Sequence, residues 1–507
     1  MPRDNTPILI GVGQVTEKKP ELAVASSPLD LMVQATRLAF EDTGLNAAFT
    51  HEIDALVVVR SFREPMRNTP EALANALHAA QSKQWLVPDG GYAPQYLVNR
   101  FSEAITRGEH QLVLLTGAEA MATGRKIVKS GAKIPWDLPS DTDPETLYDS
   151  PEMWNEHERQ HGVWQASHVY PLFENALRQH LGRGLTEHQN IMGEIFSRLS
   201  EVATTSAHAW FPTFRSPAEI ANPSARNRYV GWPYTKYMNA MNQVNQSASV
   251  VLTSVVHARE LGVDESRWVY LHGCADVTEI WELTQRVNYF SSPAINLLGK
   301  ESLAMAGISM DDIEHIDLYS CFPSAVQIAC AELGIAADDP RPLTVTGGLP
   351  FHGGAGNNYV MNSIAAMVDK VRAAPSSYGL VTANGGFLGR HSAGIYSTRP
   401  VEDDWVRKDP ATYQPQIDNL KSPAFTKTPV GEARIESYSI VFGRSNEPES
   451  GIVIGRLGEI DDPEATRFIA NLPDDEALLR AMTEKEYVNA KGTVQQVKEQ
   501  NIFTPTV

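Results

Sequence analysis

The chain has 507 residues, of which 42% are hydrophobic and 21% are charged, and its formal net charge is −18. The length predicts about three domains, and the composition is that of a folded globular protein, which excludes disordered and collagen-like chains. The acidic balance disfavours nucleic acid or an anionic membrane as the main partner. A local basic cluster remains compatible with a small anionic ligand.

Cysteine and histidine usage argues against a metal centre or a disulfide framework. The three cysteines, Cys274, Cys321 and Cys330, are too few and too unevenly spaced for either. The 14 histidines form no metal-binding motif, so we expect no metal. No apolar window is long enough to span a membrane, and the first residues do not have the pattern of a signal peptide. We therefore expect a cytoplasmic protein without membrane insertion.

The start of the chain alternates apolar runs with helical patterns. Residues 29–42 and 95–105 carry apolar side chains at helical spacing. Three apolar runs have the length of strands: residues 7–13, 53–59 and 111–117. This alternation predicts an α/β core half with a parallel sheet over residues 1–122.

The order changes after residue 122 and resumes near residue 268. Residues 123–240 are irregular and rich in Pro, Trp, His and Arg, which predicts an inserted domain. Residues 241–266 are small and apolar, and we interpret them as a buried helix that returns to the first half. Residues 267–405 then predict a second core half. Residues 410–507 predict an added small domain, β-rich or α+β, and residues 433–457 in it predict a hairpin with its turn at 446–451.

An internal repeat relates the two core halves. The segments 27–56 and 292–319 share their order of residue types, and in both a glycine precedes an Ile-Asp pair by nine residues (Gly44 to Ile53, Gly307 to Ile316). Each copy predicts a helix closed by a glycine, a short connection and a strand. The alternative is that strand–helix units share this order by chance, but duplication also explains the equal spacing.

Three loops place reactive or flexible residues directly after an apolar strand. In the first, residues 316–323, the strand ends at Tyr319 and Cys321 before a new helix, whose dipole is expected to lower the pKa of the thiol. The alternative is that Cys321 is a small buried apolar residue.

The other two loops are rich in glycine. Residues 346–359 hold His352, a candidate general base or oxyanion donor, although a structural turn with a surface histidine fits equally well. In residues 379–394 the amides of Gly385 and Gly386 are candidate oxyanion donors and His391 follows, but a structural hairpin is an equal alternative. Neither loop has the spacing of a nucleotide-binding fingerprint.

The order of these features resembles the thiolase superfamily over about residues 5–400. The run LVLLTGAEAM (112–121) is similar to the strand and turn that end the N-terminal thiolase core, and NQSASVVL (245–252) is similar to a later family segment. Tyr-Ser-Cys-Phe (319–322) falls where sterol-carrier-protein thiolases have His-Asp-Cys-Phe. The C-terminal addition resembles the thiolase-like protein type 1 group. The resemblance implies five-layered duplicated α/β halves with an inserted loop domain and an added C-terminal domain.

The resemblance also shows departures at the catalytic positions. It places the nucleophilic cysteine of the family at Gly91, the second catalytic cysteine at Ala383, and the asparagine that holds an oxyanion-hole water at Tyr319. A chain without both cysteines cannot follow the usual thiolase route. The residues that the resemblance leaves as candidates for catalysis are Cys321, His352 and His391, with Gly385 and Tyr92 as backbone candidates for an oxyanion hole.

The resemblance further implies that the inserted domain binds coenzyme A (CoA). The candidates for contact with this ligand are Arg226, Arg228, Lys236, Ser247 and Tyr319. The alternative is that the three cations among them are solvated charges on the surface. We expect acyl transfer or C–C bond chemistry on CoA thioesters, with no permanently bound cofactor. The alternative is a catalytically silent homologue that binds acyl-CoA or a partner enzyme. The sequence does not fix the oligomeric state; a homo-oligomer is only what the resemblance allows, because thiolases commonly form dimers or tetramers.

Overall fold

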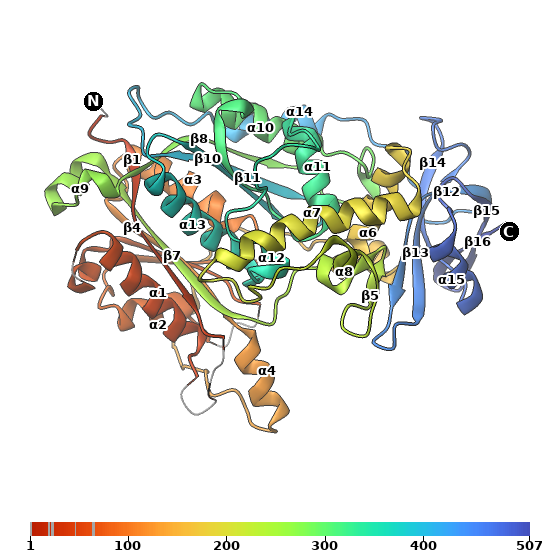
Figure 1. The fold of residues 1–507 in the computed structure, drawn as a ribbon, viewed down its shortest axis with the longest axis horizontal. Helices are drawn as coiled ribbons and strands as arrows, with labels where there is room; N and C mark the ends of the chain where they lie inside the picture. Colours follow the sequence, from red (N-terminus) through yellow and green to blue (C-terminus); the bar gives the residue numbers. More distant parts are fainter. Residues whose placement is uncertain (1–2, 19–20, 22–24, 46, 63–65, 507) are drawn as a thin grey trace.

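The computed structural model describes residues 3–18, 21, 25–45, 47–62 and 66–506. Its core is a nine-stranded sheet in the order β3-β2-β4-β7-β1-β8-β11-β10-β9 (Figure 1). The two halves of this sheet meet where β1 and β8 pair over a short stretch. The strands are β1 (Pro7–Thr16), β2 (Ala55–Val59), β3 (Lys83–Val87), β4 (Leu112–Ala120), β7 (Asn245–Ser254), β8 (Val269–Thr278), β9 (Ile313–Asp317), β10 (Tyr378–Gly385) and β11 (Arg390–Ser397).

Helices on both faces of each half give the core five layers. The helices are α1 (Pro28–Asp42), α2 (Thr69–Ala76), α3 (Ala93–Thr106), α10 (Pro293–Ala306), α11 (Pro323–Leu333) and α13 (Tyr359–Ala373). Between the halves, α3 and α13 contact β7 on one side and β10 and β11 on the other. On the outside, α1 packs on the first half, and α10 packs on the second with α11 beside it. This arrangement confirms the predicted five-layered α/β core. The predicted parallel sheet is only partly correct, because β2 is parallel to β3 and β4 but β7 is antiparallel to both β1 and β4.

Close packing of helix on strand recurs in both halves. A methyl group added to Gly13 would collide with the Ala35 carbonyl of α1, and one added to Gly273 would collide with the Ser302 carbonyl of α10. Both helices are followed by a short 3-10 helix and then by a strand, β2 or β9. The repeat found in the sequence therefore corresponds to two copies of the same helix–strand unit.

The predicted return helix over residues 241–266 is wrong. Most of this segment is β7, which pairs with β1 on one side and β4 on the other, and only Val255–Leu261 forms a helix, α9. All ten residues of β7 are buried, so both faces carry small or apolar side chains. A strand buried on both faces shows no alternation that would distinguish it from a buried helix.

The inserted region and the added region share a second sheet. This seven-stranded sheet has the order β13-β14-β16-β15-β12-β5-β6, and β13 also pairs with β12. Its strands are β5 (Tyr229–Trp232), β6 (Tyr234–Thr235), β12 (Gly431–Phe442), β13 (Pro448–Leu457), β14 (Thr466–Asn471), β15 (Lys491–Val497) and β16 (Gln500–Pro505). The two regions that the sequence separates are therefore continuous in space.

The helices of the insertion and of the added region are α4 (Met121–Lys129), α5 (Glu156–Gln160), α6 (Ala166–His180), α7 (Leu185–Thr205), α8 (Pro217–Ala221), α14 (Pro415–Asp418) and α15 (Glu476–Glu484). Among them, α6 packs on β12 and β5, and α15 packs on β13 and β12. A short helix of the second core half, α12 (Gly348–Phe351), contacts α7. The hairpin predicted for residues 433–457 is confirmed as β12 and β13. Its turn lies earlier than predicted, because Gly443 N donates to Glu447 O at 2.9 Å and β13 begins at Pro448.

A buried arginine attaches the added region to the core. The side chain of Arg467 is fully buried, forms an ion pair with Glu436 at 2.6 Å and donates to the Thr284 carbonyl at 3.3 Å. Such a charge is tolerated in the interior only when it is paired and hydrogen-bonded. Within the described part of the chain, no helix has the length and apolar character that crossing a membrane requires. Nor do the described side chains gather three or more potential metal ligands at one place.

Candidate functional site

The three loops singled out in the sequence meet next to the ends of β9 and β10. Leu349 N of the glycine-rich turn donates to Ser320 Oγ at 3.2 Å. Tyr319 N donates to Thr382 Oγ1 at 3.0 Å. Residues far apart in the chain therefore form one centre, as expected where parallel strands of one sheet end together.

The hydroxyl of Tyr319 fills the space beside Gly91, where the resemblance places the family nucleophile. Gly91 lies just before α3, and a methyl group added to it would lie 2.7 Å from the Asn384 carbonyl oxygen and closer still to the Tyr319 hydroxyl. The cavity beside Tyr319 and Ala383 has a volume of only about 20 Å³. That space holds about one water molecule. The positions at which the resemblance places both family cysteines and the family asparagine thus lie together, and the cavity beside two of them is small.

Cys321 is close to polar side chains and is nevertheless deeply buried. Its Sγ lies 4.0 Å from Asn384 Nδ2, which donates to the Tyr170 hydroxyl at 2.9 Å. The residue is 6% exposed, and burial raises the pKa of its thiol to about 12. The expected lowering of this pKa by the dipole of α11 is wrong because desolvation of the thiolate outweighs the dipole.

His352 is an internal residue rather than a surface one. It is 1% exposed, and its ring lies edge-on to Tyr359 at a centroid distance of 5.8 Å. Burial lowers its pKa to about 3, and the neighbouring His208 contributes in the same direction. The turn that holds it requires glycine, because Gly347 and Gly353 have φ of 108° and 112°. His352 is therefore a neutral imidazole near neutral pH.

The hairpin residues pack against one another. His391 is 3% exposed, its Nε2 lies 3.2 Å from the Leu388 carbonyl, and burial lowers its pKa to about 3. A methyl group on Gly385 would collide with the ring of Tyr92, so these two oxyanion candidates are in contact. Burial raises the pKa of the Tyr92 hydroxyl, which accepts a hydrogen bond from Arg390 at 2.7 Å.

Ser247 does not face a ligand site. It is fully buried in β7, and its hydroxyl donates to the Gly117 carbonyl at 2.8 Å. The resemblance implied that this residue contacts the substrate. In the sheet the hydroxyl is used between neighbouring strands.

A large basic pocket lies beside the glycine-rich turn. Its volume is about 750 Å³, and it contains all three cations expected to contact CoA, namely Arg226, Arg228 and Lys236. Phe351 and Met241 form part of its wall, and Met241 N donates to Leu349 O at 3.2 Å. Pocket and loop centre are therefore neighbours.

Three further cations line the same pocket, and the sequence alone did not indicate them. Arg125 comes from α4 and Arg215 from the insertion, where its guanidinium lies 4.0 Å from the ring centre of Tyr237. Arg444 comes from the β12–β13 turn of the added region. More than 200 residues separate Arg444 from Arg228, and only the shared second sheet brings them together. No carboxylate lines the described wall of this basic pocket.

Comparison with known proteins identifies relatives of this fold. A family model, the thiolase-like protein type 1 additional C-terminal domain, matches residues 412–499. A monomeric SCP2-thiolase like protein type 1 from Mycobacterium smegmatis is 34% identical, with full coverage of both chains and a TM-score of 0.85. No curated protein matches the sequence.

Two more distant structures share the fold over 78% of the chain. The dimeric peroxisomal thiolase of Saccharomyces cerevisiae is 12% identical, with 98% of that chain covered and a TM-score of 0.55. An acetyl-CoA acetyltransferase from Syntrophomonas wolfei is 13% identical, with 100% of that chain covered and a TM-score of 0.53. At these identities the likeness concerns the fold alone.

Proposed function

Because the chain belongs to the SCP2-thiolase-like protein type 1 family, within the thiolase superfamily, we propose that it binds a CoA thioester and holds the phosphates of the nucleotide in the basic pocket. The observation that carries this proposal is the accumulation of six cations around one cavity with no carboxylate among the described lining residues. CoA carries three phosphate groups, and arginine and lysine are the side chains that bind phosphate.

The charges of the basic pocket are largely free to bind a ligand. Among the described residues, Arg215 is the one pocket cation with a carboxylate partner, Glu219 at 3.5 Å. Arg226, Lys236 and Arg444 are exposed. In a chain with a net charge of −18, unpaired cations at one place are more readily explained by a polyanionic ligand than by the solubility of the surface.

The position of the pocket suits a ligand with a long arm. Residues 240 and 241 connect the pocket to both loops, since Ala240 N donates to Cys321 O at 3.1 Å and Met241 N donates to Leu349 O at 3.2 Å. The pantetheine arm of a bound CoA would run along this segment toward the glycine-rich turn.

The centre beside this arm supports binding better than acyl transfer. Tyr319 fills the space beside Gly91, the position that the resemblance assigns to the family nucleophile. With a pKa of about 12, roughly one Cys321 thiol in 10⁵ is ionised at pH 7. A neutral, buried His352 can donate one hydrogen bond to a thioester oxygen, but it carries no imidazolium charge there. We therefore propose a ligand-binding member of the superfamily that does not exchange thioesters.

Acyl transfer through Cys321 is the second candidate function. It is favoured by the amide of Asn384 beside the sulfur and by the Tyr170 hydroxyl that this amide contacts. Both would stabilise a thiolate that formed when the loop opened. This route requires the thiol to become accessible to the ligand.

Calorimetric titration with acetyl-CoA tests the binding site. Arg226→Ala and Lys236→Ala are each expected to weaken binding about tenfold, which corresponds to ~1.4 kcal/mol per lost phosphate contact. Lys300→Ala, an exposed lysine on α10 outside the pocket, is the matched control and should bind as the wild type does. Equal affinity of all four proteins would refute the assignment of the phosphates to this pocket.

A further inference from the structure

A second large cavity lies apart from the basic pocket and shares no lining residue with it. Its volume is about 620 Å³, within the range of small-molecule sites. It lies between α3, the end of β8, the start of β11 and residues 407–414, which lead into the added region. Gln414 fixes this last segment on β8 by accepting from Thr278 N at 2.9 Å and donating to Thr278 O at 2.7 Å.

Three tyrosine rings form one wall of this second cavity. The ring centres of Tyr92 and Tyr96 are 5.9 Å apart, those of Tyr96 and Tyr148 are 5.2 Å apart, and those of Tyr92 and Tyr148 are 6.2 Å apart. All three rings line the cavity. Such a cluster offers a flat apolar ligand both stacked and edge-on contacts.

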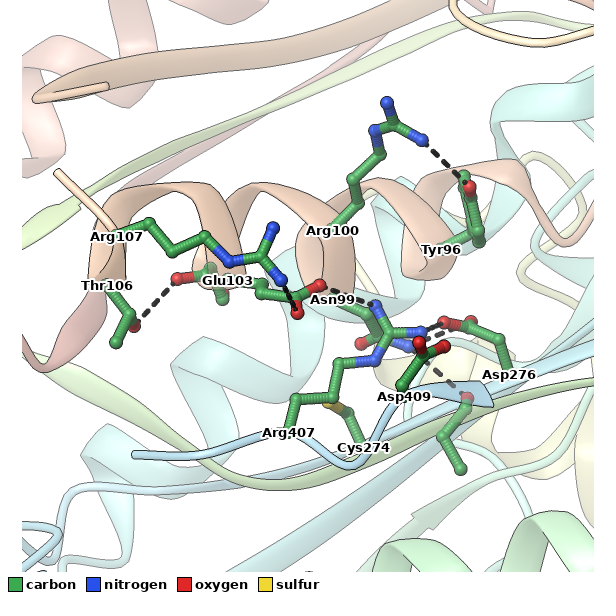
Figure 2. A network of polar contacts seen from close by, with 12 residues as sticks. Tyr96, Asn99, Arg100, Glu103, Thr106, Arg107, Cys274, Asp276, Arg407 and Asp409 are labelled. Carbon is green, nitrogen blue, oxygen red and sulfur yellow. Dashed lines mark hydrogen bonds and ion pairs between the residues drawn. The ribbon is translucent and has the colours of Figure 1, made fainter. Parts of the chain in front are cut away.

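Most charges in the second cavity neutralise one another. Arg407 forms an ion pair with Asp276 and lies 3.8 Å from Glu103, as Figure 2 shows beside α3. Arg107 pairs with Glu103 and lies 3.8 Å from Glu109. These pairs leave little net charge at the α3 side of the cavity.

Arg390 differs from these arginines because aromatic groups surround it. Its Nη1 donates to the Tyr92 hydroxyl at 2.7 Å, and its guanidinium lies 5.4 Å from the Tyr92 ring centre and 5.1 Å from that of Trp281. Among the described residues no carboxylate lies within ion-pair distance of it. A half-buried guanidinium held in this way keeps donors for an external anion.

We propose that this second cavity binds an organic monoanion that has a flat apolar body and one carboxylate. The carboxylate of this ligand would bind Arg390, and its apolar body would lie against the three tyrosines. A planar guanidinium matches a carboxylate in bidentate geometry. The exposed Asp149 and Asp409 at the rim disfavour a ligand with several negative charges, such as a polyphosphate. This ligand is distinct from the CoA thioester, and the proposal does not depend on CoA binding.

Titration with naphthoate, an aromatic monoanion, and with the isosteric neutral naphthamide tests this site without any mutation. The wild type should bind one naphthoate per chain at least tenfold more tightly than naphthamide, and saturating CoA should not displace it. Equal binding of acid and amide would overturn the proposal, as would no saturable naphthoate binding up to about 1 mM. Displacement by CoA would also overturn it, because it would place the acid in the basic pocket.

Variants locate the contact. Arg390→Met should reduce naphthoate affinity at least tenfold and leave naphthamide affinity unchanged, whereas Tyr148→Ala should weaken both ligands. Arg37→Met, an exposed arginine on α1, is the matched control. Unchanged naphthoate binding by Arg390→Met would overturn the proposal, and a Tyr148→Ala result confined to the acid would contradict the role of the rings.

Discussion

Replacing Gly91 by alanine tests the geometry of the occupied catalytic position. The added methyl group would lie 2.7 Å from the Asn384 carbonyl oxygen, 2.9 Å from Tyr319 Cζ and closer to the Tyr319 hydroxyl, so the surroundings must shift. Overpacking of this kind costs about 1–3 kcal/mol. We expect the free energy of unfolding to fall by ~2 kcal/mol, measured by urea denaturation followed by fluorescence.

The same experiment identifies the cause. Gly184→Ala, where the new methyl group meets nothing within 4 Å, should cost less than about 1 kcal/mol. In a double-mutant cycle, Tyr319→Ala should recover part of the cost of Gly91→Ala, with a coupling of ~1 kcal/mol. The reasoning is refuted if Gly91→Ala is as stable as the wild type, or if its cost is the same with and without the Tyr319 side chain.

Three further predictions concern reactivity, pH and assembly. Iodoacetamide should modify Cys321 about 10³-fold more slowly than a free thiol, because burial raises its pKa from 9.0 to about 12. The rate is followed by peptide mass spectrometry, and a rate equal to that of a free thiol would contradict this prediction. Folding lowers the pKa of His352 to about 3, so on acidification the unfolded chain takes up a proton before the folded one does. Below pH 6.5 the free energy of unfolding, measured with urea, should therefore fall by ~1.4 kcal/mol per pH unit more in the wild type than in His352→Gln. The same pH dependence in both proteins would contradict this. In contrast to the dimers and tetramers common among thiolases, the chain should be a monomer by light scattering, because the edge strand β3 is already bonded through Leu86 N, which donates to Glu145 O at 2.9 Å. A dimer would contradict this prediction.

The fold was largely predictable because the repeat and the strand–helix alternation are local patterns. Ser27 and Ser292 accept hydrogen bonds at the starts of α1 and α10, and Gly307 closes α10 with φ of 66°, so the boundaries of these helices are encoded within a few residues. The strand β7 was not predictable in the same way. β1 and β4 pair with its two edges, α1 covers one face and α3 and α13 cover the other, and all these elements are distant in sequence.

The candidate site was predictable in its loops but not in its chemistry. The order of Tyr319, His352 and Gly385 along the chain located the centre. The pKa of Cys321 depends on how much water the surrounding elements exclude, and no local motif encodes that. The basic pocket shows the same limit, because Arg444 reaches it through the pairing of β5 with β12.

Incubation of the protein with acetyl-CoA and a 3-ketoacyl-CoA, followed by native and denaturing mass spectrometry, tests the central claim most directly. We predict a non-covalent complex with one ligand per chain, no acyl adduct after denaturation and no release of free CoA. An acyl group on Cys321, or CoA release that disappears in Cys321→Ala, would contradict this account and establish acyl transfer instead.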